Sequence, residues 1–250
     1  MKNFSLINLL TILLAGNFAY AQKLPGVQQG GLLAPANIKI DGKATEWGDK
    51  FQAYNKNIEA FYTLSNDDEK IYLTVKATTH DIASKILRGG LTLIINHTVK
   101  KNDPEAVSLT YPVLRGGDMA AVTNMYARRS FKQEDGEEAS VKQLNDLLEA
   151  KSKTIEVTGI KTITDKDISV YNEEGIKAAA LFDDRNAYIC EIAIPLKYLN
   201  LPNGESFSYH IKINEEPTTS KASNGPPPPP VFIGALGTTD FWGEYTLAKK

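Results

Sequence analysis

The sequence predicts an all-β protein built as an antiparallel β-sandwich with one inserted amphipathic helix. Two observations support this fold class. Apolar and polar residues alternate with a period of two in many short segments, which is typical of strands that bury one face. Clusters of turn-forming residues separate these segments at spacings that suit hairpins between antiparallel strands. We therefore expect two packed sheets around a shared core.

The first 21 residues match a secretory signal peptide. One lysine precedes an apolar run from Leu6 to Ala15, and Ala-Tyr-Ala at 19–21 fits a small-x-small cleavage site. A membrane anchor is the alternative, but the run is well short of the roughly 20 apolar residues that cross a bilayer. We expect an exported protein, periplasmic or extracellular, whose mature chain begins near Gln22 and carries no membrane span.

The mature chain is long enough for one large β domain. We expect a lead-in over residues 22–37 and a single β-sandwich domain over residues 38–250, with a helical insertion near 115–152. Five consecutive prolines end a polar stretch near 215–230, so this loop is expected to be disordered. The formal net charge is -2 with both signs interspersed, which leaves no basic field for nucleic acid.

The early strands are expected to form a hairpin. The segments at 58–64 (IEAFYTL) and 70–77 (KIYLTVKA) flank the turn cluster SNDDE. In the second segment Ile71, Leu73 and Val75 point to one face because successive strand residues alternate between faces. The hairpin therefore contributes one apolar face to the core.

The chain before and after this hairpin shows two further features. The Asp41-Gly42 corner is a tight turn that we expect to begin the first layer of the sandwich. Residues 81–90 (DIASKILRGG) have helical spacing and end on glycines, which predicts a short crossing helix. Strands are expected to follow it at 91–96 and 106–114.

The insertion carries the clearest helical pattern of the mature chain. Residues 137–151 (EEASVKQLNDLLEAK) place Val141, Leu144, Leu147 and Leu148 on one stripe, with charged residues around the rest. This pattern predicts an amphipathic helix that packs its apolar stripe on the sandwich.

Strands resume after the insertion, at 154–160, 167–172, 175–183, 187–195, 206–214 and 239–250. Within SFSYHIKIN, the residues Phe207, Tyr209 and Ile211 alternate with polar side chains, which predicts a half-buried strand with His210 facing solvent. Cys190 is the single cysteine, so the fold has no internal disulfide. It lies on an apolar strand and is expected to be a buried hydrophobe; a reactive thiol is the alternative.

Three separated stretches carry a resemblance to a known family. They are IKIDGKATEWGD at 38–49, DDEKIYLTVKA at 67–77 and ICEIAIPLKYLNL at 189–201. In this order they resemble the family 9 carbohydrate-binding module and its relatives in the DOMON-like superfamily, over about residues 38–247. The resemblance implies an antiparallel β-sandwich. It leaves function open, since related sandwiches bind sugars, hold haem or act as accessory domains.

Sugar-binding members of that family clamp their ligand between two exposed tryptophans. Here the candidates are Trp47 and Trp242, with Glu244 as a polar acceptor on the same strand face as Trp242. Each tryptophan has an alternative role in packing. Trp47 can fold back as a core plug with its N–H bonded, and Trp242 can pack at a strand end.

The sequence offers no catalytic residues and no metal ligands with a recognised spacing. Residues 67–69 (DDE) are expected to be a solvated turn rather than a pair of acids for hydrolysis. His80, His97 and His210 stand apart from one another and from Cys190, which gives zinc no ligand cluster. A structural calcium ion held by loop oxygens stays open. We expect no cofactor.

The sequence therefore favours an exported, non-catalytic β-sandwich that binds a ligand, most simply a carbohydrate. The first alternative is a structural or protein-interaction domain of the bacterial envelope, with the helix near 137–150 and the proline loop contacting a protein partner. The second is a haem-binding redox domain that uses a histidine with Met119 or Met125, although both methionines lie in the insertion.

Overall fold

The structure is a computed structural model that describes residues 23–48, 50–130, 140–201, 204–216 and 237–250. The predicted signal peptide lies outside the described residues, as does the proline-rich loop from residue 217 on. None of the described helices is both long and apolar enough to cross a bilayer.

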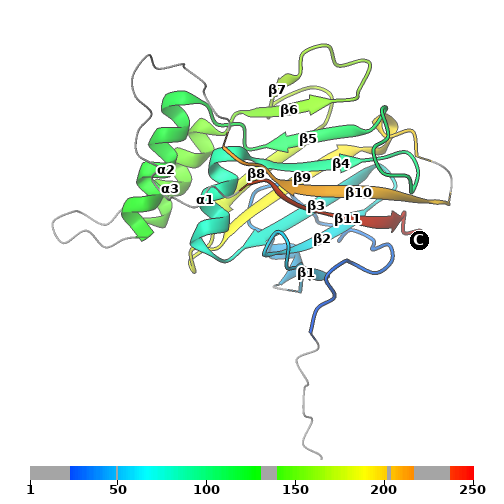
Figure 1. The fold of residues 1–250 in the computed structure, drawn as a ribbon, viewed down its shortest axis with the longest axis horizontal. Helices are drawn as coiled ribbons and strands as arrows, with labels where there is room; N and C mark the ends of the chain where they lie inside the picture. Colours follow the sequence, from blue (N-terminus) through cyan, green and yellow to red (C-terminus); the bar gives the residue numbers. More distant parts are fainter. Residues whose placement is uncertain (1–22, 49, 131–139, 202–203, 217–236) are drawn as a thin grey trace, which may run out of the picture.

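The described strands form two antiparallel sheets that pack face to face, which confirms the predicted antiparallel β-sandwich (Figure 1). Among these strands, sheet A has the order β1 (Ala53–Asn55), β2 (Ala60–Asn66), β3 (Lys70–Ala77), β9 (Tyr188–Pro195) and β8 (Lys177–Phe182). Sheet B has the order β11 (Thr239–Thr246), β10 (Ser206–Ile213), β4 (Leu91–Ile95), β5 (Val107–Tyr111), β6 (Thr154–Thr158) and β7 (Asp167–Ser169).

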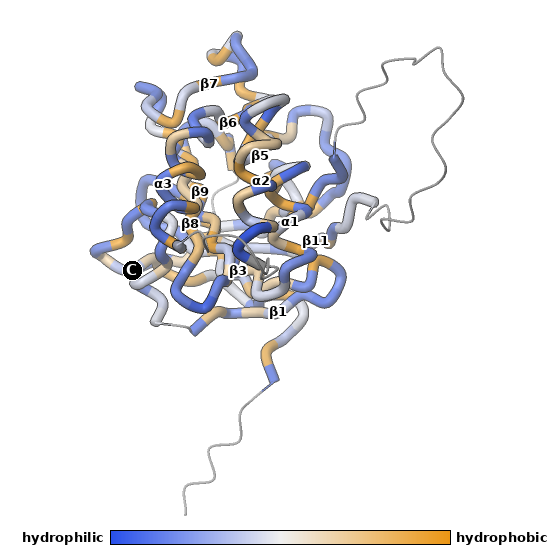
Figure 2. Tube along the Cα trace, turned by 90° about the vertical axis from the view of Figure 1, so that its left-hand side faces the viewer, coloured by the Kyte–Doolittle hydropathy of each residue, from blue (hydrophilic) through white to orange (hydrophobic). Residues whose placement is uncertain are grey.

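One apolar core fills the space between the sheets, as the alternation predicts. Phe207, Tyr209 and Ile211 of β10 are fully buried, which confirms the inward face of this strand. Tyr62 of sheet A meets Tyr209 across the core, with the two hydroxyls 2.9 Å apart. Figure 2 shows hydrophobic residues along strands such as β5 and β9, and hydrophilic residues in the connecting loops. Cys190 is buried on β9 and burial raises its pKa, so it behaves as a small hydrophobe.

The helices gather at one end of the sandwich (Figure 1). They are α1 (His80–Gly89), α2 (Gly116–Ser130) and α3 (Val141–Lys151), with short 3-10 turns at Thr45–Trp47 and Leu196–Tyr198. Helix α1 confirms the short crossing helix. The described part of the insertion holds two helices, because α2 forms from the small-residue segment GGDMAAVTNMYARRS, whose weak apolar pattern did not predict it.

Helix α3 is the predicted amphipathic helix, and it packs on the edge of sheet A. Ser140 and Gln143 close a capping box at its start, with Gln143 N–H donating to Ser140 Oγ at 3.1 Å. Leu144 and Leu148 are fully buried. The Asn145 amide pairs with both backbone groups of Phe182 on β8, at 2.9 and 2.8 Å. The apolar stripe and the strand edge therefore cover each other.

The lead-in is part of the sandwich rather than a free arm. The Gln28 side chain lies along β2 and takes the place of a further strand, donating to Leu64 O at 2.7 Å and accepting from Leu64 N–H at 2.8 Å. Gln28 N–H donates to Tyr62 Oη at 2.8 Å. The Tyr245 hydroxyl meets both backbone groups of Leu32, at 3.0 and 3.1 Å.

Replacing Gln28 by alanine should lower the free energy of unfolding by about 2 kcal/mol, since it leaves both buried backbone groups of Leu64 without a partner. Chemical unfolding followed by tryptophan fluorescence measures the change. Gln29→Ala is the matched control, because the Gln29 side chain is exposed and bonds only to Val27 O within the described structure. Equal stability of the two variants would contradict the strand-like role of Gln28.

Residues 38–48 and 50–51 cover the outer face of sheet A, so the expectation that the Asp41-Gly42 corner begins a layer is wrong. The corner forms no strand. Its two backbone N–H groups donate to the Glu191 carboxylate, at 3.0 and 2.8 Å. Glu191 lies on the outward face of β9 and is fully buried under this cover. Motifs that are 150 residues apart thus hold each other in place.

Candidate functional site

The candidate site lies on the outward face of sheet B, at its β11 edge. Phe241 and Tyr245 turn into the core, so Trp242 and Glu244 point outward together. The alternation in β11 predicted their shared face but not its direction. Trp242 pairs with His210 in the neighbouring strand, and their rings stack with centroids 4.0 Å apart and an interplanar angle of 15°. The His210 imidazole therefore supports one face of the indole.

His210 is covered by this stacking, which corrects the expectation that it faces solvent. The residue is only 9% exposed. Its Nε2 lies 3.4 Å from an Asp240 carboxylate oxygen. Burial lowers the pKa of His210 and outweighs the opposing effect of Asp240, so the ring that stacks on Trp242 is neutral at pH 7.

A cavity of about 470 Å³ opens beside the indole. Three distant parts of the chain form its walls: the lead-in, the loop after β4, and the strands β10 and β11. The lining residues are Val27, Gln28, Gln29, Gly30, Val99, Lys101, Ser206, Ser208, Trp242, Gly243, Glu244 and Thr246.

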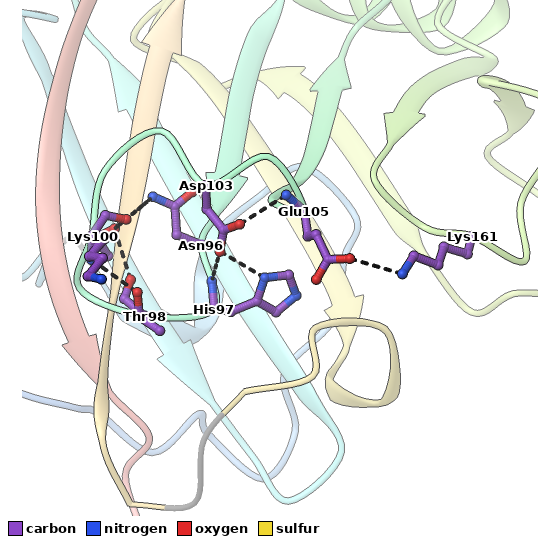
Figure 3. A network of polar contacts seen from close by, with 8 residues as sticks. Asn96, His97, Thr98, Lys100, Asp103, Glu105 and Lys161 are labelled. Atoms are coloured by element: carbon purple, nitrogen blue, oxygen red, sulfur yellow. Dashed lines mark hydrogen bonds and ion pairs between the residues drawn. The ribbon is translucent and has the colours of Figure 1, made fainter.

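The loop after β4 is ordered by side-chain contacts, which fixes the wall that it contributes (Figure 3). The Asn96 amide donates to Lys100 O at 2.7 Å and to Ser208 Oγ at 2.9 Å, which ties the loop to β10. Asp103 accepts from Glu105 N–H, and from both the backbone N–H and the ring Nδ1 of His97. These hydrogen bonds lower the pKa of Asp103 and keep it ionised.

Opposite charges flank the indole at the mouth of the cavity. Lys101, carried by this ordered loop, has its Nζ 5.5 Å from the centre of the Trp242 ring. Glu244 is exposed two residues along the strand. Within the described residues, neither the Lys101 ammonium nor the Glu244 carboxylate makes a hydrogen bond or ion pair. Both polar groups remain available to a ligand.

Trp47 lies far from this cavity, on the outward face of the opposite sheet. It is 8% exposed and its Nε1–H donates to Thr74 Oγ1 at 3.1 Å. It packs in a second apolar cluster with Phe51 and Ile189. Because Trp47 and Trp242 lie on opposite sides of the sandwich, they do not form the two-tryptophan clamp that the family resemblance implies.

The cavity contains residues that sequence reasoning missed. Ser206 and Ser208 were visible as the polar alternates of β10, but nothing in the sequence connected them to Trp242. Lys101 and Gln29 stand in segments without periodicity, and only the folded chain brings them to β11.

The other candidates from the sequence do not converge on a site. His97 is held by Asp103, and His80 at the start of α1 stacks on Tyr126 with centroids 4.9 Å apart. Met119 and Met125 are partly buried against the core. Over the described ranges, no group of three or more His, Cys, Asp and Glu side chains is placed to hold a metal ion.

The turn at 67–69 is a structural element. Asp67 accepts from the N–H groups of Glu69 and Lys70 at 2.8 and 2.7 Å, and from the Tyr72 hydroxyl at 2.6 Å. Its carboxylate is therefore committed to closing the β2–β3 hairpin.

The fold and the cavity together define a β-sandwich with an open, aromatic-walled hollow on one sheet face. No protein-family model matches the chain, and no curated protein matches it. Among solved structures, one match is a family 9 carbohydrate-binding module from Caldicellulosiruptor kristjanssonii in complex with glucose. It is 10% identical, with a TM-score of 0.38, over 89% of this chain and 96% of that chain. The sandwich fold of this protein rests on its own strand pairing and not on that likeness.

Proposed function

We propose that this protein is a non-catalytic binding module that holds a saccharide in the cavity beside Trp242. The observation that carries the proposal is the indole itself. It is half-buried, stacked on the His210 ring, and forms one wall of an open hollow of about 470 Å³. A ligand that stacks on a ring already held in place loses little affinity to side-chain ordering.

The polar groups around the indole suit a polyhydroxylated ligand. A sugar ring presents an apolar C–H face and a rim of hydroxyl groups that both donate and accept hydrogen bonds. Trp242 offers a matching apolar face, Glu244 an acceptor, Lys101 a donor and the Gln29 amide an acceptor oxygen. A few convergent polar groups beside an aromatic wall are the common pattern of small-ligand sites.

The biological setting is part of this proposal. A signal peptide at 1–21 would direct the chain to the periplasm or the cell exterior, where residues from the lead-in to the C terminus would act as one binding unit. The envelope-protein alternative finds less support from helix α3, since its buried residues Leu144 and Leu148 already pack within this chain.

Trp242→Ala should weaken saccharide binding at least about tenfold, because stacking and apolar burial on an indole exceed about 1.4 kcal/mol. Affinity gel electrophoresis against a panel of soluble polysaccharides finds the ligand, and isothermal titration calorimetry measures the affinity. Trp242→Phe keeps an aromatic face and should retain part of the binding, which separates loss of stacking from loss of fold.

Tyr171→Ala is the matched control. Tyr171 is an aromatic residue that is 71% exposed and follows β7, at the other edge of sheet B from Trp242. Its removal should leave binding unchanged. If Trp242→Ala and Tyr171→Ala bind equally well, the ligand does not stack on Trp242. If the intact protein is retained by no polysaccharide, the saccharide proposal fails as a whole.

A further inference from the structure

A second hollow, of about 400 Å³, lies on the same outward face of sheet B. Residues of β4, β5 and β10 form its floor, among them Ile94, Ser108 and Lys212, and Arg88 and Arg115 stand at its rim. It shares no lining residue with the cavity beside Trp242. The two hollows are therefore separate sites on one sheet face.

The strand register joins the two hollows directly. Trp242 pairs with His210, His210 with Ile94, and Ile94 with Ser108, so these side chains form one outward row across β11, β10, β4 and β5. The row starts in the first cavity and ends in the second. Since neighbouring strands lie about 4.8 Å apart, three steps span roughly 14 Å. This is longer than a single sugar ring.

The floor of the second hollow is rigid. The hydroxyls of Thr92 and Thr110 lie 2.7 Å apart. The Asn214 amide donates to Gly89 O and Gly90 O at 3.0 and 3.3 Å and to Thr92 Oγ1 at 2.8 Å. These groups satisfy one another and hold the strand ends in position, so a ligand would meet a preformed surface.

Two side chains of this floor are left for a ligand. Ile94 is half-buried on the outward face, where it offers an apolar contact in the middle of the row. Lys212 is half-buried beside it, and within the described ranges its ammonium makes no hydrogen bond and no ion pair. In contrast, Arg115 is engaged by Asp167 at 2.9 Å and by Glu156 at 3.5 Å.

We propose that the ligand is an extended oligosaccharide chain, with one unit stacked on Trp242 and further units passing over His210 of β10 into the second hollow, where they meet Ile94 of β4 and Lys212, two residues beyond His210 on β10. This inference rests on the proposed saccharide function and deepens it. A chain that occupies both hollows adds the contacts of Ile94 and Lys212 without a second loss of translational freedom, so its affinity exceeds that of one sugar. Trp242 anchors a ligand of any length, whereas Lys212 acts only on a long one.

The test is a length series, from monosaccharide to tetrasaccharide, of the sugar selected by the polysaccharide panel, titrated by calorimetry. Affinity should rise by roughly tenfold or more between one and four units. Lys212→Ala should remove several-fold of the tetrasaccharide affinity and leave the monosaccharide affinity unchanged. Ile94→Arg places a long side chain in the middle of the row, where the oligosaccharide would cross. It should lower the affinity for the tetrasaccharide to that for the short sugars. Trp242→Ala should weaken every length.

Lys43→Ala, on the cover of the opposite sheet, is the control and should change nothing. If the affinity does not change with the length of the sugar, the extended ligand is ruled out and the single-sugar site is left intact. The same conclusion follows if Lys212→Ala lowers the affinities for one and for four units equally. Absence of binding at every length, by contrast, removes the saccharide function itself. Circular dichroism of each variant confirms that the fold persists.

Discussion

Raising the pH from about 4.5 to 7 should lower the stability of the folded protein by on the order of 3 kcal/mol through a single group, Glu191. This carboxyl group is fully buried on the outward face of β9. One oxygen accepts the N–H groups of Asp41 and Gly42, and the other, Oε1, makes no hydrogen bond within the described structure. Ionisation therefore places a charge with half of its acceptor capacity unused under the cover segment.

The direction of the effect follows from the pKa of Glu191. Burial raises it from 4.5 to about 7, although the Gly42 and Asp41 hydrogen bonds oppose the shift. The folded state then holds the proton more tightly than the unfolded state. The stabilising contribution is fully present below the unfolded pKa of 4.5 and is lost as the pH rises through the folded pKa.

Glu191→Gln isolates this contribution, because glutamine keeps an acceptor oxygen for the two N–H groups and cannot ionise. Urea unfolding of both proteins at pH 4.5, 6 and 8 should show the wild type losing about 3 kcal/mol relative to the variant across this range. Glu149→Gln makes the same change at an exposed position of α3 and is the control. Its free energy of unfolding should depend on pH as that of the wild type does. If the free energy of unfolding of Glu191→Gln changed with pH in the same way as that of the wild type, burial would not disfavour ionisation of the Glu191 carboxyl group, and the prediction would be wrong.

Gly243→Ala should lower the free energy of unfolding by about 3 kcal/mol, through overpacking of the core. Gly243 lies between Trp242 and Glu244 but faces inward, against the ring of Tyr209. A Cβ atom there would lie 2.2 Å from Tyr209 Cζ and 2.3 Å from its hydroxyl oxygen. The ring cannot swing away, because it is fully buried, bonded to Tyr62 and set edge-on to Phe241.

Urea unfolding measures this change, and Gly117→Ala is the control. Gly117 lies in α2, and a methyl group added there would meet open space, so alanine at this position should not reduce stability. A double variant that also carries Tyr209→Leu lacks the ring that blocks the methyl group. Its loss in free energy of unfolding should therefore be smaller than the sum of the losses of Gly243→Ala and Tyr209→Leu. A Gly243→Ala protein as stable as the wild type would mean that β11 shifts to make room, which calorimetry of ligand binding would then detect beside Trp242.

The candidate site shows how far local pattern reaches. Alternation in β11 placed Trp242 and Glu244 on one face, because a strand turns successive side chains to opposite sides whatever surrounds it. It did not say which face is the core. The same uncertainty applied to Trp47, whose ring ends in a buried cluster with Thr74 as its hydrogen-bond partner. Nothing within a few residues of either tryptophan distinguishes the two outcomes.

The helices of the insertion show the same limit of local pattern, since α3 was predicted and α2 was not. Residues 141–151 carry leucines on one stripe, and this local signal sufficed to predict α3. Helix α2 has small residues and a weak stripe, and it is stabilised by packing against α1 and α3. The strength of that packing depends on neighbours that the local sequence does not contain.

The sequence by itself predicted the described strands other than β1, the residues that share a strand face and the antiparallel sandwich, since these depend on periodicities of two within a few residues. Only the tertiary structure decided that the Asp41-Gly42 corner covers Glu191 and that the Gln28 side chain bonds to the edge of β2. It also decided that the lead-in, the loop after β4 and β11 meet at one cavity. The reason is physical: such contacts join residues far apart in the chain, and their partners are chosen by shape and unpaired polar groups in the folded state.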